Sequence, residues 1–183
     1  MKNAIIFHGT AGSPDSFWIP WLRQELEGVG YDVWAPQLPE GEDPQLSAWL
    51  GRVRGGEKFK VSEDTVMVGH SAGCPLILSL LENISVRIRQ VILVAGYVTP
   101  LGKGTDGMLQ RVYNWERISQ RAGEFYFINS DNDPWGCDDR QGRIMLDHLG
   151  GTLVIRKGEG HMGSDAFHQP YREFPLLKKL IVG

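Results

Sequence analysis

Short apolar runs alternate along the whole chain with segments in which apolar residues recur at helical spacing. Such alternation is typical of strand-helix units arranged around a mostly parallel sheet. The runs are apolar nearly throughout, as expected for strands that helices cover on both faces. They predict strands near Ala4–Phe7, Asp32–Ala35, Thr65–Val68, Gln90–Val94, Glu124–Ile128 and Thr152–Ile155.

Two of the intervening segments carry bulky apolar residues that we interpret as helical stripes facing the core. The first contains Trp18, Trp21, Leu22 and Leu26, and the second contains Leu46, Trp49, Leu50 and Val53. Further helices are predicted from Ala72 to about Glu82, over Met108–Gln120, over Asp139–Leu149 and from Phe174 onwards.

The 183 residues suffice for one well-filled core and are few for two, so we expect a single domain over residues 1–183. The formal net charge is −3, and no block of Lys or Arg marks a nucleic-acid or anionic membrane surface. Cys74 and Cys137 are too few for a disulfide framework or a zinc site, and Cys74 is expected to be a small buried residue. With neither a signal-peptide pattern nor a bilayer-length apolar run, the expected location is cytoplasmic.

The segment Gly69-His70-Ser71-Ala72-Gly73 directly follows a predicted strand and directly precedes a predicted helix. In this context G-x-S-x-G forms a tight turn that strains the serine backbone and exposes its Oγ, while the glycines let strand and helix pack closely. A structural serine in a Gly-rich turn is the alternative. We interpret Ser71 as a nucleophile.

A serine nucleophile needs a base, and the base needs an acid that fixes its tautomer. In this architecture the acid and then the histidine follow the serine in the chain, each after a later strand. The loop "NSDNDPWG" offers Asp133, whose backbone Pro134 restricts, and Asp131, which we expect to shape the turn. In "KGEGHMGSD", His161 is the predicted base, and His168 is the alternative.

The loop after the first predicted strand, "FHGTAGSPDSFW", has the spacing of neither a dinucleotide-binding loop nor a P-loop. A loop at this position can offer a backbone N–H to the oxyanion that forms when a carbonyl is attacked. The predicted donors are Thr10 and Ala72, and His8 is expected to brace the loop. His70 and His148 are interpreted as structural.

Together, "FHGTAGSPDSFWIPWL", "VGHSAG", "SDNDPW" and "GEGHMG" resemble the α/β-hydrolases, more narrowly the small, capless serine hydrolases of the retinoblastoma-binding protein 9 type. The resemblance covers nearly the whole chain. It implies a three-layer α/β sandwich with six mostly parallel strands in the order 2-1-3-4-5-6, and Thr10 facing Ser71 where that order reverses. It also implies Ser71 as nucleophile, Asp133 as acid and His161 as base.

Two further features bear on the substrate. After Trp135 the chain continues "GCDDRQG", which is more polar than the family pattern, so the substrate contacts near Trp135 stay open. Residues 97–123 are too few to form a large cap domain. Trp18, Met108, Trp135 and Met162 are candidates both for lining an apolar pocket and for packing.

The sequence therefore predicts a carboxylesterase-like serine hydrolase that cleaves a small acyl ester or amide through an acyl-enzyme, with no metal or organic cofactor. A non-catalytic protein-binding module on the same scaffold is one alternative. Perhydrolase or lyase chemistry at the same serine is the other. The expected partner is a small-molecule acyl substrate, and no residue pattern indicates nucleic acid, membrane or a protein partner.

Overall fold

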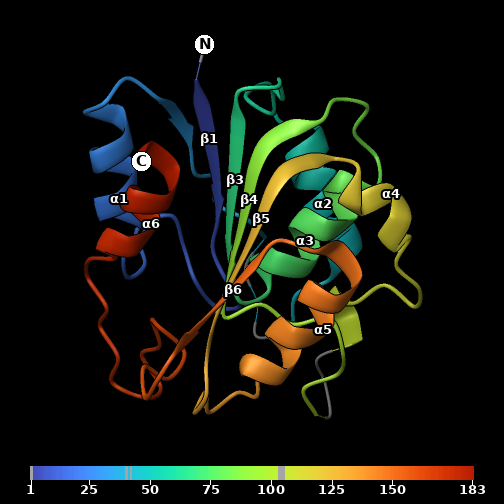
Figure 1. The fold of residues 1–183 in the computed structure, drawn as a ribbon. Coiled ribbons are helices and arrows are strands. Elements are labelled where there is room, and N and C mark those ends of the chain that lie inside the picture. Colours follow the sequence, from blue (N-terminus) through green and yellow to red (C-terminus); the bar gives the residue numbers. More distant parts are fainter. Residues whose placement is uncertain (1, 40, 42, 103–105) are drawn as a thin grey trace.

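A six-stranded sheet forms the centre of the molecule in the computed structural model, which describes residues 2–39, 41, 43–102 and 106–183 (Figure 1). Every neighbouring pair of strands is parallel, and the order is β2-β1-β3-β4-β5-β6. The predicted fold class and strand order are thus confirmed. The strands are β1 (Asn3–Phe7), β2 (Asp32–Trp34), β3 (Thr65–His70), β4 (Ile88–Val94), β5 (Ala122–Ser130) and β6 (Thr152–Arg156).

Helices cover both faces of this sheet and complete the three layers (Figure 1). One face carries α1 (Ile19–Glu27) and α6 (Pro175–Val182), so segments near the two ends of the chain pack in the same layer. The other face carries α2 (Leu46–Arg54), α3 (Gly73–Leu81), α4 (Trp115–Ser119) and α5 (Asp139–Leu149).

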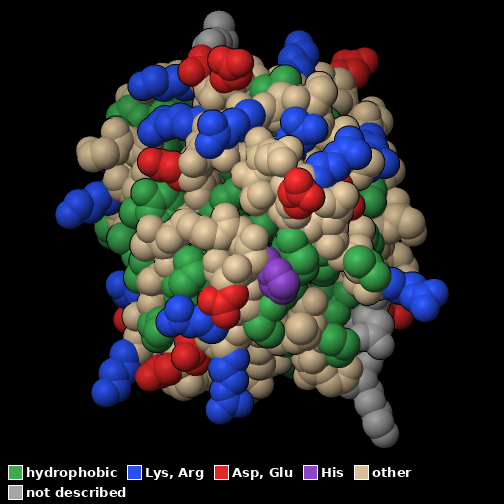
Figure 2. Space-filling view, turned by 45° about the vertical axis from the view of Figure 1, so that its right-hand side comes forward, with side chains coloured by type: hydrophobic (Ala, Val, Ile, Leu, Met, Phe, Trp, Pro, Cys, Tyr) green, Lys and Arg blue, Asp and Glu red, His purple; other side chains and the backbone are tan. Residues whose placement is uncertain are grey.

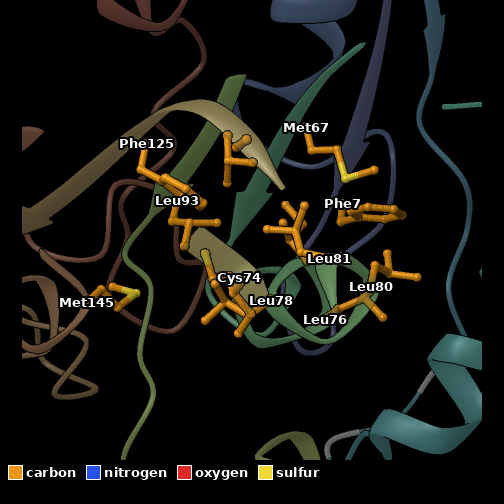
Figure 3. Close-up of a cluster of buried hydrophobic side chains, with 14 of the residues drawn as sticks. Phe7, Met67, Cys74, Leu76, Leu78, Leu80, Leu81, Leu93, Phe125 and Met145 are labelled. Carbon is orange, nitrogen blue, oxygen red and sulfur yellow. The ribbon is translucent and has the colours of Figure 1, made fainter. Parts of the chain in front are cut away.

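A buried apolar cluster fills the space between the sheet and α3 (Figure 3). Leu76 and Leu80 of α3 belong to it, together with Phe7 of β1 and Met67 of β3. Every residue of α3 is buried, which explains why this helix is apolar on all sides.

The two predicted helical stripes face the core. Trp49 and Val53 of α2 are buried in the cluster beside α3, whereas Leu22 and Leu26 of α1 are buried in a second cluster on the opposite face of the sheet. Trp18, at the N-cap of α1, is fully buried in that second cluster.

The predicted helix over Met108–Gln120 is wrong for its first half. A short 3-10 turn (η1, Asp106–Met108) ends where the predicted helix begins, and α4 does not start until Trp115. Gln110 Nε2 donates to Ser79 Oγ, and the backbone N–H of Asn114 donates to Glu82 Oε1, so α3 holds this segment in an irregular path. The Asn114 side chain then caps α4 by accepting from the Arg117 N–H.

The carboxyl ends of the strands meet at the lower edge of the sheet in Figure 1. The strand order reverses between β1 and β3, and crevices at such reversal points are where open α/β sheets bind ligands. The loops that follow β1, β3, β5 and β6 lie at this edge and carry the predicted site residues.

Side chains of both charge signs are mixed on the face seen in Figure 2, and apolar side chains form small separate patches between them. Among the described residues, every helix is too short or too polar to cross a membrane.

Candidate active site

Ser71 occupies the sharp turn between β3 and α3. Its φ of 52° lies in the left-handed region, which costs a residue with a side chain about 1 to 2 kcal/mol. The surrounding backbone enforces this conformation, because the Ser71 N–H donates to Val94 O at 2.9 Å and the Ser71 carbonyl accepts from the Cys74 N–H at 2.9 Å. The strained turn places Ser71 on the wall of a cavity at the carboxyl edge of the sheet.

Asp133 and His161 come from the loops after β5 and β6 and lie in direct contact. The distance from His161 Nδ1 to Asp133 Oδ2 is 2.7 Å, and both side chains are buried. Because a carboxylate only accepts, Nδ1 carries the proton and Nε2 keeps its lone pair. The other carboxylate oxygen, Asp133 Oδ1, accepts from the Trp135 N–H at 2.8 Å. Because each oxygen has a partner, the orientation of the carboxylate is fixed.

Asp131, the alternative acid, has a different task. It is exposed, and its Oδ1 accepts from the Gly158 N–H at 2.8 Å, which ties together the loops after β5 and β6. Between these two carboxylates, the structure brings only Asp133 to the histidine.

His168, the alternative base, lies outside the cavity. His168 is exposed, and its backbone N–H donates to Asp165 O at 3.1 Å. His148 is exposed on α5 and stacks on Trp115 with ring centroids 4.5 Å apart. Neither belongs to the lining of the cavity that contains Ser71 and His161.

The backbone around His161 is held by three side chains, two of which come from distant parts of the chain. His70 Nε2 donates to the His161 carbonyl at 2.9 Å, and Trp18 Nε1 donates to the Met162 carbonyl at 3.0 Å. Gln169 Oε1 accepts from the His161 N–H at 2.9 Å. The imidazole therefore faces the cavity from a loop whose polar groups are already bonded.

His70 lies beneath this loop as a neutral residue. Complete burial, together with a smaller contribution from the neighbouring His161, lowers its pKa from 6.5 to about 3. Its ring packs edge-on against Trp18, with centroids 5.8 Å apart, and lies 4.9 Å from the His161 ring. The structural interpretation of His70 agrees with these contacts.

The loop after β1 approaches Ser71 closely. A Cβ on Gly9 would lie 2.9 Å from Ser71 Cβ, so glycine is required at this contact. His8 braces the loop as expected, because its Nδ1 donates to Gly9 O at 2.8 Å and its Nε2 accepts from the Leu38 N–H at 3.0 Å. Burial lowers the pKa of His8, which favours this neutral form.

The two predicted oxyanion donors have unequal positions. Thr10 lines the same cavity as Ser71, whereas Ala72 is fully buried at the N-cap of α3 and is absent from the lining. Within the described ranges, neither amide N–H donates to an acceptor in the protein. Of the two, only Thr10 lines the cavity, so its N–H is the one placed for a substrate oxygen.

The cavity has a volume of about 560 Å³, within the usual range for small-molecule sites. Trp135 contributes to it, as the sequence allowed, but Trp18, Met108 and Met162 are buried in packing and do not line it. None of the described lining residues is Lys or Arg. Its apolar wall is formed by Phe17, Ile19, Tyr97, Leu101 and Trp135.

An exposed aromatic pair stands beside the cavity. Trp135 and Phe167 are each nearly half exposed and pack edge to face, with centroids 5.2 Å apart.

The polar residues after Trp135 have a local role, because Asp138 caps α5 by accepting from the Arg140 N–H. The departure from the family pattern thus shapes the start of a helix.

Ser71 and His161 line the same cavity, but within the described residues no hydrogen bond joins Ser71 Oγ to His161 Nε2. Such contacts are often long before substrate binds and shorten in the complex. The side chain of Ser71 interacts with the thiol of Cys137. Burial raises the pKa of this thiol, with a further contribution from the Asp133 charge.

Sequence reasoning assigned no role to Cys137, Gln169 or the Trp18 indole N–H. Cys137 and Trp18 act through contacts with residues distant in the chain, and 144 positions separate Trp18 from Met162. Gln169 acts on His161 from eight positions away, in the same loop. The one available signal was general: a buried Trp usually finds an acceptor for its N–H.

Comparison with known proteins gives a consistent result. The model of a family described as serine hydrolase matches residues 4–179. YdeN of Bacillus subtilis (strain 168), a protein named as a hydrolase, is 30% identical over 136 residues, which cover 72% of this chain and 71% of YdeN.

Solved structures show the same fold. The crystal structure of YdeN aligns with a TM-score of 0.88 and 24% identity, covering 99% of this chain and 97% of that one. The α/β-hydrolase domain-containing protein 10 from mouse aligns at 0.70 with 12% identity, covering 98% and 87%. Est1E from Butyrivibrio proteoclasticus, solved with ferulic acid bound, aligns at 0.65 with 14% identity, covering 99% and 86%.

Proposed function

The chain belongs to the serine hydrolase family, and from this premise we propose that it hydrolyses a small acyl ester or amide with Ser71 as nucleophile, His161 as base and Asp133 as acid. The observation that carries the proposal is the 2.7 Å contact between His161 Nδ1 and Asp133 Oδ2, beside a cavity that Ser71 also lines. That contact leaves the lone pair of Nε2 available for a proton.

In the first half of the reaction, Ser71 Oγ attacks the carbonyl carbon while His161 Nε2 takes the hydroxyl proton. The negative charge that forms on the carbonyl oxygen is stabilised by the backbone N–H groups of Thr10 and Ala72. Asp133 stabilises the positive imidazolium. Transfer of the proton from His161 to the leaving group then breaks the ester or amide bond and leaves an acyl-enzyme.

The second half repeats these steps with water. Water loses a proton to His161 Nε2 and attacks the acyl carbon, and Ser71 then departs and regains its proton. The cavity supports a substrate with an apolar acyl group that carries no negative charge, because its wall is largely apolar and its described lining residues include Asp165 but no Lys or Arg. The free N–H groups of Thr10 and Ala72 support a carbonyl substrate.

The proposal is tested by labelling the purified protein with a fluorophosphonate probe and by measuring hydrolysis of p-nitrophenyl esters of increasing chain length. We expect labelling, and a roughly 10⁶-fold loss of turnover in Ser71→Ala. Circular dichroism and thermal melting verify that the variant is folded. Equal labelling of Ser71→Ala and the wild type would remove Ser71 from the reaction.

A histidine pair gives a matched control. His161→Ala should lose turnover, whereas His168→Ala should retain it, because His168 is exposed and does not line the cavity. Equal rates in the two variants would exclude His161 as the base.

A further inference from the structure

Cys137 lies in the loop between β5 and α5, fully buried yet on the wall of the cavity. Asn129 Nδ2 donates to its backbone carbonyl at 2.9 Å, which fixes this part of the loop. One potential ligand atom each of Asp133, Cys137 and His161 lies within 4.8 Å of the other two. In the described part of the chain, this is the one group of three such residues that meets this distance.

The three side chains form a donor set that suits zinc. Zinc binds a cysteine sulfur, a histidine nitrogen and a carboxylate oxygen at about 2.0 to 2.3 Å, so neighbouring ligand atoms of a tetrahedral site lie about 3.3 to 3.8 Å apart. The group needs only small side-chain movements to reach that spacing. Since Cys137 and His161 both line the cavity, a fourth position is open to water.

Hydrogen bonds already hold the Asp133 side chain and the backbone of the other two ligands in place. The Asp133 carboxylate accepts from the Trp135 N–H, the His161 carbonyl accepts from His70, and the Cys137 carbonyl accepts from Asn129. Such support orients ligands before the metal arrives and increases affinity.

We propose that Asp133, Cys137 and His161 bind Zn²⁺ from the cavity, and that the bound ion inhibits the enzyme reversibly. The binding does not depend on the reaction, whereas the inhibition rests on the function proposed above. When Zn²⁺ binds, Cys137 releases its thiol proton to solvent, and Asp133 and His161 donate lone pairs without any change of oxidation state.

Inhibition follows whichever ring nitrogen binds the ion. If His161 Nδ1 binds Zn²⁺, the neutral ring must carry its proton on Nε2, which then cannot accept the Ser71 proton. If Nε2 binds, its lone pair is occupied. In both cases the base is lost while the metal is bound.

Binding is measured with reduced protein and Zn²⁺ alone, by competition against a chromophoric chelator. We expect Cys137→Ala to weaken binding at least tenfold, because even the partners that orient metal ligands are worth 10- to 100-fold in affinity. Cys74→Ala is the matched control, since this second buried thiol lies in α3 outside the group. Ser71→Ala should bind Zn²⁺ like the wild type.

Cobalt(II) provides a spectroscopic readout of the same ligands. A thiolate-to-cobalt band in the near ultraviolet is expected for the wild type, Cys74→Ala and Ser71→Ala, and its loss is expected for Cys137→Ala. Cys137→Ser, which keeps the size of the side chain, replaces the alanine variant if that one does not fold. Equal Zn²⁺ affinity in the wild type and the Cys137 variant would overturn the site.

The inhibitory effect is measured as the rate with Zn²⁺ divided by the same variant's rate with excess chelator. The wild type should lose activity and regain it when chelator is added, and Cys137→Ala should need at least tenfold more Zn²⁺ for the same loss. Tight binding with an undiminished rate would overturn the inhibition. A wild type that binds Zn²⁺ yet hydrolyses no ester even with chelator would instead contradict the proposed function.

Discussion

Replacing Gly73 by alanine tests whether the close contact between β1 and α3 positions the active site. A Cβ at this position would lie 2.7 Å from Phe7 O and 2.9 Å from His8 O. Both contacts are with backbone, which cannot rotate away as a flexible side chain could. Ordinary contact begins at 3.4 Å, so α3 and the end of β1 must separate by about 0.7 Å (3.4 minus 2.7).

This separation has a predictable cost. Overpacking of a filled interior costs about 1 to 3 kcal/mol, and each kcal/mol lowers the melting temperature of a chain of this size by roughly 2 to 4 °C. We therefore expect Gly73→Ala to melt about 2 to 12 °C below the wild type. Because the shift displaces the loop that carries Thr10, kcat for an ester should fall by about 10- to 100-fold.

Gly51→Ala is the matched control. Gly51 lies inside α2, is exposed, and has no atom within 4 Å of an added Cβ. Alanine should stabilise this helix by up to about 1 kcal/mol and leave the rate unchanged. Thermal melting and p-nitrophenyl ester hydrolysis measure both variants. A Gly73→Ala protein with the melting temperature and rate of the wild type would refute the reasoning.

Three further predictions concern the strained turn, pH and the acid. Ser71→Gly should be more stable than Ser71→Ala by about 1 kcal/mol in urea unfolding, because glycine tolerates a φ of 52°; equal stabilities would mean that the turn is unstrained. The buried His70, with a pKa of about 3, stays neutral while the unfolded chain gains a proton below pH 6.5. The free energy of unfolding should therefore fall on acidification, by up to about 1.4 kcal/mol per pH unit. His70→Gln should remove this part of the slope between pH 6.5 and 5, and an unchanged slope would contradict the assignment. Asp133→Asn should lower kcat by about 10⁴-fold, whereas Asp131→Asn should retain it, and similar ester hydrolysis by the two would contradict the choice of Asp133.

Much of the fold could be predicted because its signals are local. A strand covered on both faces must be apolar along its length, and a helix on the sheet must be apolar on one side. The positions of apolar residues in the sequence were therefore enough to locate β1 and α1. The strand order came from a family resemblance and was confirmed. The helix predicted over Met108–Gln120 failed in its first half because Ser79 of α3 and Glu82, the C-cap of α3, bind polar groups of that segment.

Some features of the candidate site could be predicted from the sequence, and others depend on how distant segments fold together. The glycines around Ser71 and the order of the acid and the histidine in the chain were visible in the sequence, and the structure brings Asp133 and His161 into contact. The position of Cys137 beside them was not visible, because it depends on how the loop after β5 turns back toward the cavity. Side-chain contacts to backbone groups, such as that of Trp18, likewise have no local pattern.

The hydrogen bond from Trp18 to Met162 spans 144 positions, so the first and last quarters of the polypeptide must meet before the imidazole loop is held in place. Such long-range closure is slow compared with the formation of local turns and helices. The contact between His161 and Asp133 can therefore form only after the chain beyond β6 has left the ribosome. The topology makes the assembly of the candidate site one of the last events of folding.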